Sequence, residues 1–395
     1  MREPLGRRQF VAGTGATLLG AALSGCSLGM RGSAQPLPRP PRLELPAVHA
    51  LVDRIAAITV CIRPFRAQGP RLEVEQIQGR TVVHNYGHGG SGWSLSWGSG
   101  EIATAQAMAS GERDIAVIGC GAIGMTTALL LQRAGANVTV YARELPPEVR
   151  SSLATGVFTP DSRICFEQHA TPAFRQLWER MARRSFSTYQ SFLGLPGTPV
   201  EFIDNYFVTD TAEPAHRSLP ASDQRPDFAH LQHELLGDLM PRGESYPPGA
   251  HPFGSRYVRG GTQLMFNLPA YTRTLMSDFL AGGGRVRIDE FHSPADFARV
   301  REKTLVNATG YGARALLGDE SLTAVRGQIA HVIPQPDIHY GLIYDGVAFV
   351  PRRDGLVFQV IGHDDYYGFD DATTIPDRAE AELAVTTIAR LFAAA

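Results

Sequence analysis

The chain has 395 residues and a formal net charge of -2, and 44% of its residues are hydrophobic and 19% charged. A chain of this length can bury a large core, either as two domains or as one two-lobed domain. The lack of a basic excess argues against a nucleic-acid partner, because no surplus positive charge is available to neutralise phosphates.

The first 26 residues predict an export signal that lies outside the fold. Gly6–Phe10 (GRRQF) places two arginines before an apolar run that ends at Cys26 and is too short and too glycine-rich for a transmembrane helix. Twin arginines in this context are typical of Tat export, and Leu23–Cys26 (LSGC) resembles a lipobox. We therefore expect export to the periplasmic face, with Cys26 as the candidate lipid anchor. The alternative is a frayed N-terminus with a chance arginine pair.

Residues 27–50 are rich in proline and predict a linker between this signal and the fold. A glycine-rich stretch follows at His84–Gly100 (HNYGHGGSGWSLSWGSG), with six glycines in seventeen residues. Such a stretch lets the backbone approach a ligand closely. We expect a helix from about Glu101 to Ala109 directly behind it. His84 and His88 could also form a metal or acid–base cluster, but we favour backbone N–H groups and the helix N-terminus as the binding groups.

A dinucleotide-binding fingerprint occupies Asp114–Glu144. The apolar residues Ile115–Ile118 predict a buried parallel strand. Gly119, Gly121 and Gly124 follow at once in a G-x-G-x-x-G pattern, which allows a tight turn, close approach of a pyrophosphate and packing of helix on strand. A helix up to Gly135 and a second strand over Asn137–Ala142 complete the β–α–β unit.

The end of the second predicted strand departs from the usual pattern. An acid is expected there to bind the adenosine ribose, but the position holds Arg143, with Glu144 one step later. Either Glu144 binds the ribose or the ribose is held differently. Arg143 could also indicate a 2′-phosphate, and hence NADP.

Several further segments carry a family resemblance. Residues 82–98 (VVHNYGHGGSGWSLSWG) resemble the flavin-binding signature of the D-amino-acid oxidase family, and residues 61–75 resemble the segment that precedes it. Residues 154–160 (ATGVFTP) resemble the segment beside the reactive edge of the flavin. Residues 305–319 resemble the family's strand-then-glycine turn, and residues 325–332 (VRGQIAHV) resemble the arginine-glycine-glutamine strand that follows it. The resemblance implies bound FAD, whose pyrimidine ring the glycine-rich stretch and its helix would contact.

The order of these segments differs from that of the family, in which the fingerprint opens the chain and the signature closes it. Here the signature comes first, so the order predicts a circular permutation. A truncated tandem fusion is the alternative. Residues 376–395 predict an amphipathic helix with Ala384, Ile388 and Leu391 on one face. We expect this helix beside residues 46–60.

The fold class implied is α/β, with a Rossmann-like FAD-binding domain and a mixed β-sheet substrate domain. We assign residues 66–165 and 255–320 to the FAD-binding domain, and residues 51–65, 166–254 and 321–395 to the substrate domain. The implied reaction is oxidative deamination of a D-amino acid or related amine, with hydride transfer to flavin N5, hydrolysis of the imine and formation of H2O2 from O2. The sequence leaves the oligomeric state open.

The resemblance assigns residues to the site, and we assign no metal site. The cofactor-binding residues are Gly87, His88, Gly89, Gly90, Ser91, Gly92, Trp93, Gly119, Gly121, Ala122, Ile123, Gly124, Arg143, Glu144, Thr155, Gly156 and Thr159. For catalysis the resemblance implies Arg63, as a clamp for the substrate carboxylate, and Tyr344. The alternatives are a surface charge for Arg63 and a core aromatic for Tyr344.

The substrate side also departs from the family. A second tyrosine for the carboxylate falls at Ala348 or Phe349, and a family glutamine is replaced by Thr159. One hydroxyl donor is therefore missing. Two other functions stay open on this basis: a catalytically idle flavin-binding lipoprotein, favoured by the missing tyrosine, and an NADP-dependent reductase, suggested by Arg143.

Overall fold

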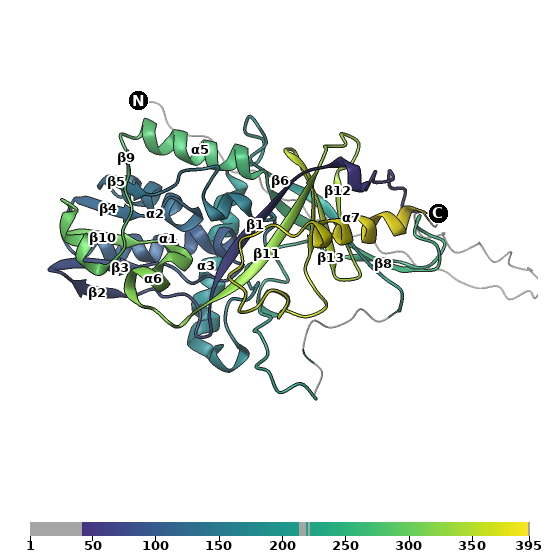
Figure 1. Cartoon of the computed structure of the whole chain (residues 1–395), viewed down its shortest axis with the longest axis horizontal. Coiled ribbons are helices and arrows are strands. Elements are labelled where there is room, and N and C mark those ends of the chain that lie inside the picture. The colour runs from purple at the N-terminus through teal and green to yellow at the C-terminus, as the bar shows by residue number, and fades with distance from the viewer. Residues whose placement is uncertain (1–41, 213–218, 220–221, 394–395) are drawn as a thin grey trace, which may run out of the picture. The chain divides into compact units, whose positions relative to one another are not determined.

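The fold is built around two β-sheets (Figure 1). The structure is a computed structural model, and it describes residues 42–212, 219 and 222–393. The smaller sheet forms one lobe, which we call the cofactor lobe after the predicted FAD-binding domain. Its six strands lie in the order β2 (Val74–Ile77), β3 (Arg80–His84), β10 (Thr304–Asn307), β4 (Asp114–Ile118), β5 (Asn137–Ala142) and β9 (Arg285–Ile288). All neighbouring pairs are parallel except β2 with β3. The two strands of the predicted β–α–β unit are therefore central, where burial on both faces explains their continuous apolar sequence.

The larger sheet is mixed and forms a second lobe, which we call the substrate lobe after the predicted substrate domain. Its eight strands lie in the order β1 (Ile55–Arg66), β11 (Leu322–Val332), β14 (Gly355–Val360), β13 (Val347–Arg352), β12 (Tyr340–Tyr344), β6 (Val200–Thr209), β8 (Tyr257–Phe266) and β7 (Glu244–Tyr246). The long strands β1 and β11 lie side by side, antiparallel, and their register pairs Cys61 with Gly327 (Figure 1). The fold class predicted from the sequence is confirmed.

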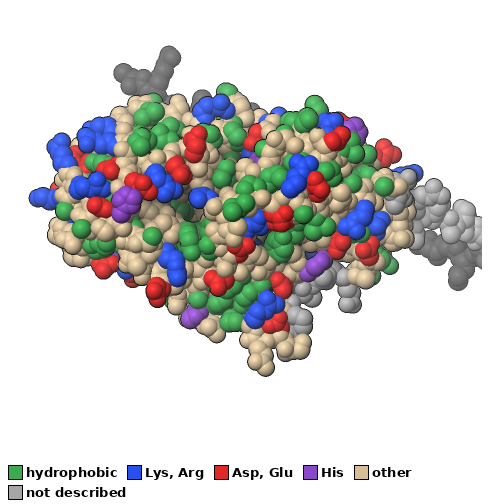
Figure 2. Space-filling model, in the orientation of Figure 1, with side chains coloured by type: hydrophobic (Ala, Val, Ile, Leu, Met, Phe, Trp, Pro, Cys, Tyr) green, Lys and Arg blue, Asp and Glu red, His purple; other side chains and the backbone are tan. Residues whose placement is uncertain are grey.

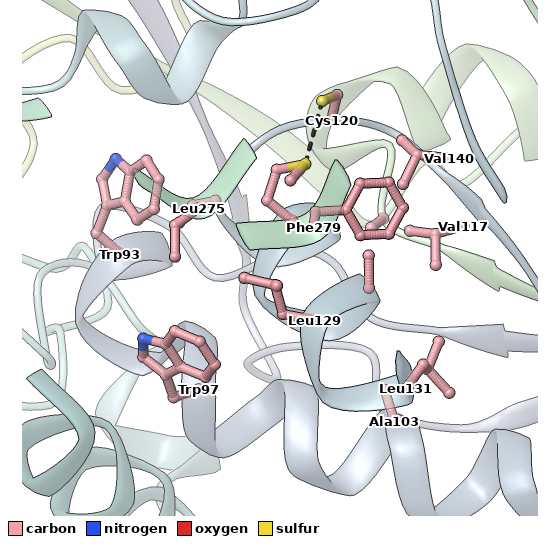
Figure 3. Packing of buried hydrophobic residues seen from close by; sticks show 14 of the residues in the cluster. Trp93, Trp97, Ala103, Val117, Cys120, Leu129, Leu131, Val140, Leu275 and Phe279 are labelled. Atoms are coloured by element: carbon pink, nitrogen blue, oxygen red, sulfur yellow. Dashed lines mark hydrogen bonds between the residues drawn. The ribbon is translucent and has the colours of Figure 1, made fainter. Parts of the chain in front are cut away.

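Helices cover both sheets. They are α1 (Gly92–Met108), α2 (Ala122–Arg133), α3 (Pro172–Gln190), α4 (Gln232–Leu235), α5 (Leu268–Ala281), α6 (Ala313–Leu317) and α7 (Arg378–Ala393). The core of the cofactor lobe lies between the six-stranded sheet and helices α1, α2 and α5. Figure 3 shows Phe279 of α5 directed toward Val117 and Val140 of the sheet, with Leu129 of α2 beside them.

Helix α1 begins at Gly92, nine residues before the predicted start at Glu101. Its first half is rich in glycine and serine, which lowers helix propensity and conceals the helix from a pattern search. Packing explains these residues. A Cβ on Gly98 would lie 2.3 Å from Met181 of α3, and one on Gly100 would lie 3.0 Å from Leu130 of α2. The glycines therefore permit close helix–helix contact rather than a loop.

Helix α7 confirms the predicted C-terminal helix, with Ala384, Ile388 and Leu391 buried against the eight-stranded sheet. Val48 belongs to the same core, and Gln335 binds the backbone of residues 47 and 49 through its side chain. Residues 42–50, expected as part of a linker, are thus packed on the substrate lobe. Val48 and Ala50 are buried there and Leu43 and Leu45 are half-buried, which a proline-rich composition does not reveal.

The predicted boundary at residue 255 also needs correction. Strand β8 was assigned to the FAD-binding domain, but it pairs with β6 over ten residues and so belongs to the eight-stranded sheet. No described helix is long and apolar enough to cross a bilayer. The predicted signal at residues 1–26 lies outside the described residues. Figure 2 shows acidic and basic side chains interspersed over one face of the molecule.

Candidate active site and cofactor site

A cavity of about 660 Å³ lies between the fingerprint, the glycine-rich loop and the eight-stranded sheet. All the residues predicted for the cofactor line it, except Gly124 and Ser91. Gly124 instead allows the helix to approach the turn, because a Cβ there would lie 2.0 Å from the carbonyl oxygen of Gly119. Ser91 is buried and donates from Oγ to the carbonyl oxygen of Ser162 at 3.2 Å. Gly124 and Ser91 therefore hold the segments that form the cavity in place, without lining the cavity themselves.

The fingerprint turn places the start of α2 at the cavity wall. Gly119 has a φ of +108°, and a Cβ on it would lie 2.5 Å from the carbonyl oxygen of Ala308, so only glycine fits the turn. The Ala122 N–H donates to Ser151 Oγ at 2.9 Å. Ser151, which sequence reasoning missed, therefore lies at the positive end of the α2 dipole, where an anionic group is favoured.

The glycine-rich loop lies tightly against the segment that contains Ser162 and Arg163. Gly89 has a φ of +55°, and a Cβ on it would lie 1.9 Å from the carbonyl oxygen of Arg163. The Gly90 N–H donates to the carbonyl oxygen of Ser162 at 2.8 Å. A Cβ on Gly92, by contrast, would meet nothing within 4 Å, so the first turn of α1 faces open space at the cavity.

Two buried polar atoms of this loop have no hydrogen-bond partner among the described residues. They are Asn85 Oδ1 and His88 Nε2, and both residues line the cavity. Burial lowers the pKa of the His88 imidazole from 6.5 to about 3, so the ring is neutral near pH 7. Buried polar atoms are normally paired, and two orphans in one cavity wall indicate a ligand with complementary polar groups.

His84 lies behind the loop and does not form a metal cluster with His88. Its Nε2 is 3.1 Å from Glu75 Oε2 and its Nδ1 is 3.3 Å from Asn307 Nδ2, so both ring nitrogens have partners. Across residues 42–212 and 222–393, no group of three His, Cys, Asp or Glu side chains could hold a metal ion.

Arg63 of β1 lines the cavity and is half-buried. Its Nη1 donates to the carbonyl oxygen of Arg326 at 3.1 Å, and no carboxylate of a described residue lies within ion-pair distance. A Cβ on Gly327 would lie 2.5 Å from Arg63 Nη2, so the glycine of the VRGQ segment makes room for the guanidinium. Arg63 therefore offers a cation without a carboxylate partner in the described fold.

The structure does not bring Tyr344 to the cavity. Its hydroxyl lies 3.2 Å from Asp210 Oδ2 and 3.3 Å from Arg256 Nη2, in a polar cluster away from the cavity wall. The register also separates Ala348 from Phe349. Both Ala348 and Phe349 line the cavity, but Ala348 pairs with Gln359, another lining residue, whereas the Phe349 side chain is fully buried in the core beneath α7. Ala348 is thus the position where the resemblance expects a tyrosine.

Comparison with known proteins shows the family of the chain. A family model described as FAD-dependent oxidoreductase matches residues 114–394. The chain belongs to this family. A D-amino-acid oxidase from Rubrobacter xylanophilus is 28% identical over 216 residues, which cover 55% of this chain and 58% of that protein. A D-amino-acid oxidase from Streptomyces coelicolor is 29% identical over 240 residues, which cover 59% and 63%.

The chain thus spans about three fifths of the length of these curated relatives. Among solved structures, the glycine oxidase of Bacillus cereus is 15% identical with a TM-score of 0.43, covering 63% of this chain and 70% of that one. The iminodiacetate oxidase of a Chelativorans species is 18% identical with a TM-score of 0.46, covering 71% and 79%.

FAD is the cofactor of this family, and the residues around the cavity fit it. The start of α2 beside Ser151 would hold the pyrophosphate. The loop from Gly87 to Trp93, with the unpartnered Asn85 Oδ1 and His88 Nε2, would hold the isoalloxazine. Arg143 lies at the other end of the cavity, where it pairs with Glu144 at 3.1 Å and Glu290 at 3.0 Å. These carboxylates occupy Arg143, so it is not a free cation for the 2′-phosphate of NADP.

Sequence reasoning missed three carboxamides that line the cavity: Asn205 of β6, Gln263 of β8 and Gln359 of β14. Gln263 Nε2 donates to the carbonyl oxygen of Phe158 at 2.8 Å, and Gln359 Oε1 accepts from the hydroxyl of Thr155. A polar residue within an apolar strand was the available signal. Such a residue indicates a site only if its side chain lies on the face of the sheet that meets the cavity, and this face is known only from the pairing of distant strands.

The neutral state of His88 makes stability depend on pH. The unfolded chain binds a proton on this imidazole below pH 6.5, whereas the folded chain does so only near pH 3. The free energy of unfolding therefore decreases as the pH is lowered from about 6.5 to about 3. From about pH 7 to about pH 5, the FAD-free protein should lose about 2 kcal/mol more than His88→Gln. Denaturant unfolding at both pH values measures this difference, and equal losses in the two proteins would contradict it.

Proposed function

We propose that this FAD-dependent oxidoreductase oxidises a D-amino acid or a related amine. The observation that carries the proposal is Arg63, a half-buried guanidinium without a carboxylate partner in the described fold, in the cavity that also holds the cofactor elements. A guanidinium binds a carboxylate through two parallel hydrogen bonds, which fixes both the position and the orientation of an amino acid. The two bacterial relatives named D-amino-acid oxidase support the same substrate class.

The chain's own task in this reaction is orientation and electrostatics. When bound, FAD supplies the acceptor for the hydride from the substrate Cα, at N5 of its ring. Arg63 positions the carboxylate and thereby the Cα–H bond. The first turn of α1 places backbone N–H groups and the positive end of the helix dipole at the cavity, where they stabilise negative charge. Water hydrolyses the resulting imine to a keto acid and ammonia, and dioxygen receives the two electrons to give H2O2.

The test is a substrate panel read through the visible flavin band without oxygen. We expect the purified protein to be yellow and the band to bleach when an accepted D-amino acid, glycine or N-methylated amino acid is added. Admission of air should restore the band and release H2O2, which a peroxidase-coupled dye detects. The corresponding L-amino acids serve as controls. If no member of the panel bleaches the band, the proposed reaction is wrong.

A second candidate rests on Ala348, which removes one hydroxyl donor from the cavity. A catalytically idle flavin protein would bind a carboxylate ligand at Arg63 without oxidising it. Benzoate is a suitable probe, because it carries a carboxylate and no oxidisable amine. Binding of benzoate together with no bleaching by the whole panel would favour this candidate, whereas bleaching by any amino acid excludes it.

We also propose that the unusual segment order is a circular permutation. Strands β1 and β3 precede the family match at residue 114, yet β1 pairs with β11 and β3 pairs with β10, so the early segment completes both sheets. Leu43 bonds to Ala250, and Phe392 of α7 packs on Phe253 nearby. A chain that begins at residue 112 and carries residues 42–111 after residue 393 should therefore fold and bind FAD. Loss of FAD binding would contradict the proposal.

A further inference from the structure

Asn205 is a buried polar side chain without a hydrogen-bond partner in the described fold. It lies in the middle of β6, is 8% exposed and lines the cavity. A carboxamide carries two donor hydrogens and an accepting oxygen. Because these groups have no protein partner in the described fold and the residue lines the cavity, a ligand in the cavity can pair with them.

The neighbouring strand is built around this side chain. Gly341 of β12 lies directly opposite Asn205 in the parallel register. A Cβ on Gly341 would lie 2.5 Å from Asn205 Oδ1, closer than a real Cβ contact permits. The backbone of Gly341 does not need glycine for its conformation, because its φ is not in the left-handed region. Glycine at position 341 therefore leaves the space that the Asn205 carboxamide needs in its present orientation.

Two further carboxamides line the same wall, and in each of them either the nitrogen or the oxygen is already hydrogen-bonded to the protein. Gln263 lies opposite Ile203 in β6, on the same face as Asn205, and its Nε2 is bonded to Phe158. Gln359 has its Oε1 bonded to Thr155. The carbonyl oxygen of Gln263 and the amide nitrogen of Gln359 therefore remain for a ligand within the described fold. With Asn205, the wall offers both donors and acceptors and no net charge.

The charges around the cavity lie elsewhere. Its carboxylates, which are Glu144, Asp289 and Glu290, follow strands of the six-stranded sheet near Arg143. Among the described residues, no carboxylate of the eight-stranded sheet lines the cavity. A cationic substrate side chain would therefore lose water without gaining an ion partner at Asn205, whereas a neutral group that both donates and accepts would satisfy the carboxamides.

We propose that Asn205 is a specificity-determining residue that hydrogen-bonds the side chain of the substrate, and that the substrate carries a neutral hydrogen-bonding side chain, a carboxamide or a hydroxyl. The proposal rests on the proposed function for the amino-acid substrate. Sites that hydrogen-bond a polar substrate group reject analogues without it far more strongly than apolar pockets discriminate by size. The carboxamides thus set the choice of side chain, and Arg63 sets the orientation of the common amino-acid part.

The experiment compares D-asparagine with D-leucine, which has a similar shape without polar atoms, and with D-lysine. In the holoenzyme, kcat/KM for D-asparagine should exceed that for either by about 100-fold or more. Asn205→Leu should reverse the order of D-asparagine and D-leucine. Gly341→Ala, which displaces the carboxamide, should also lower the ratio of kcat/KM for D-asparagine to kcat/KM for D-leucine. Asp204→Ala, an exposed neighbour on the other face of β6, should leave it unchanged.

Binding of D-asparagine, measured by calorimetry, separates this proposal from the proposed function. If no amino acid bleaches the flavin but D-asparagine binds the native protein more tightly than Asn205→Leu, oxidation fails and the role of Asn205 stands. If the native protein prefers D-leucine or D-lysine, or does not bind D-asparagine, the role of Asn205 is overturned. Equal preferences in the native protein and Asn205→Leu overturn it as well.

Discussion

Replacing Arg63 with alanine should lower kcat/KM for an accepted amino acid by about 100-fold or more. Two charge-assisted hydrogen bonds to the substrate carboxylate are lost, at about 1.5–3 kcal/mol each. The substrate then also loses its fixed orientation, so kcat should fall together with a rise in KM. Rates of anaerobic flavin bleaching over a range of substrate concentrations separate the two parameters. FAD content should remain near that of the native protein, because Arg63 extends from the substrate lobe.

Two companion variants make the Arg63 result specific. Arg63→Lys keeps the charge but cannot form two parallel hydrogen bonds, so its kcat/KM should lie between the native and alanine values. Arg180→Ala removes an exposed arginine of α3 and should change neither parameter. Native kinetics in Arg63→Ala would remove the basis of the proposed reaction. Weaker benzoate binding in Arg63→Ala without any turnover in the native protein would instead support the idle flavin protein.

The fingerprint could be predicted almost to the residue because its signals are local. The strand over Asn137–Ala142 has the predicted bounds, and Gly119 and Gly121 line the cavity as the motif requires. An apolar run of strand length, a glycine turn and a helical period each act within a few residues. The start of α1 was missed for the opposite reason. Glycines such as Gly98 were interpreted as a loop, although they permit contact with Met181 of another helix.

The substrate side could not be predicted to the same extent because it depends on the register of distant strands. The resemblance alone left Ala348 and Phe349 as equal candidates and both line the cavity, so only the pairing with Gln359 shows that the side chain of Ala348 shares a face with that carboxamide. Tyr344 matched by its position in the chain, but its hydroxyl turns to Asp210. Asn205 carried no motif. A one-residue change of register moves a side chain to the other face of a sheet.

Replacing Gly121 with valine should abolish stable FAD binding while the fold is retained. Gly121 is the N-cap of α2 and has a φ of -80°, so valine imposes no left-handed strain. Its Cβ would lie 3.0 Å from Ser151 Oγ, and its methyl groups would have to enter either this contact or the cavity at the helix start. We expect a colourless protein with a native far-UV spectrum, and FAD affinity about 100-fold or more below that of the native chain, equal to at least about 2.7 kcal/mol.

The matched control is Gly261→Ala in β8, where an added Cβ would meet nothing within 4 Å and FAD content should stay native. Titration of the FAD-free proteins with FAD, followed by flavin fluorescence, gives the affinities. Gly121 differs from Gly124 in this test. A Cβ on Gly124 would strike the carbonyl oxygen of Gly119 at 2.0 Å and distort the turn itself, so its variants lose FAD and stability together. Full FAD content in Gly121→Val would mean that the pyrophosphate does not lie at the start of α2, because the added methyl groups occupy the space beside it.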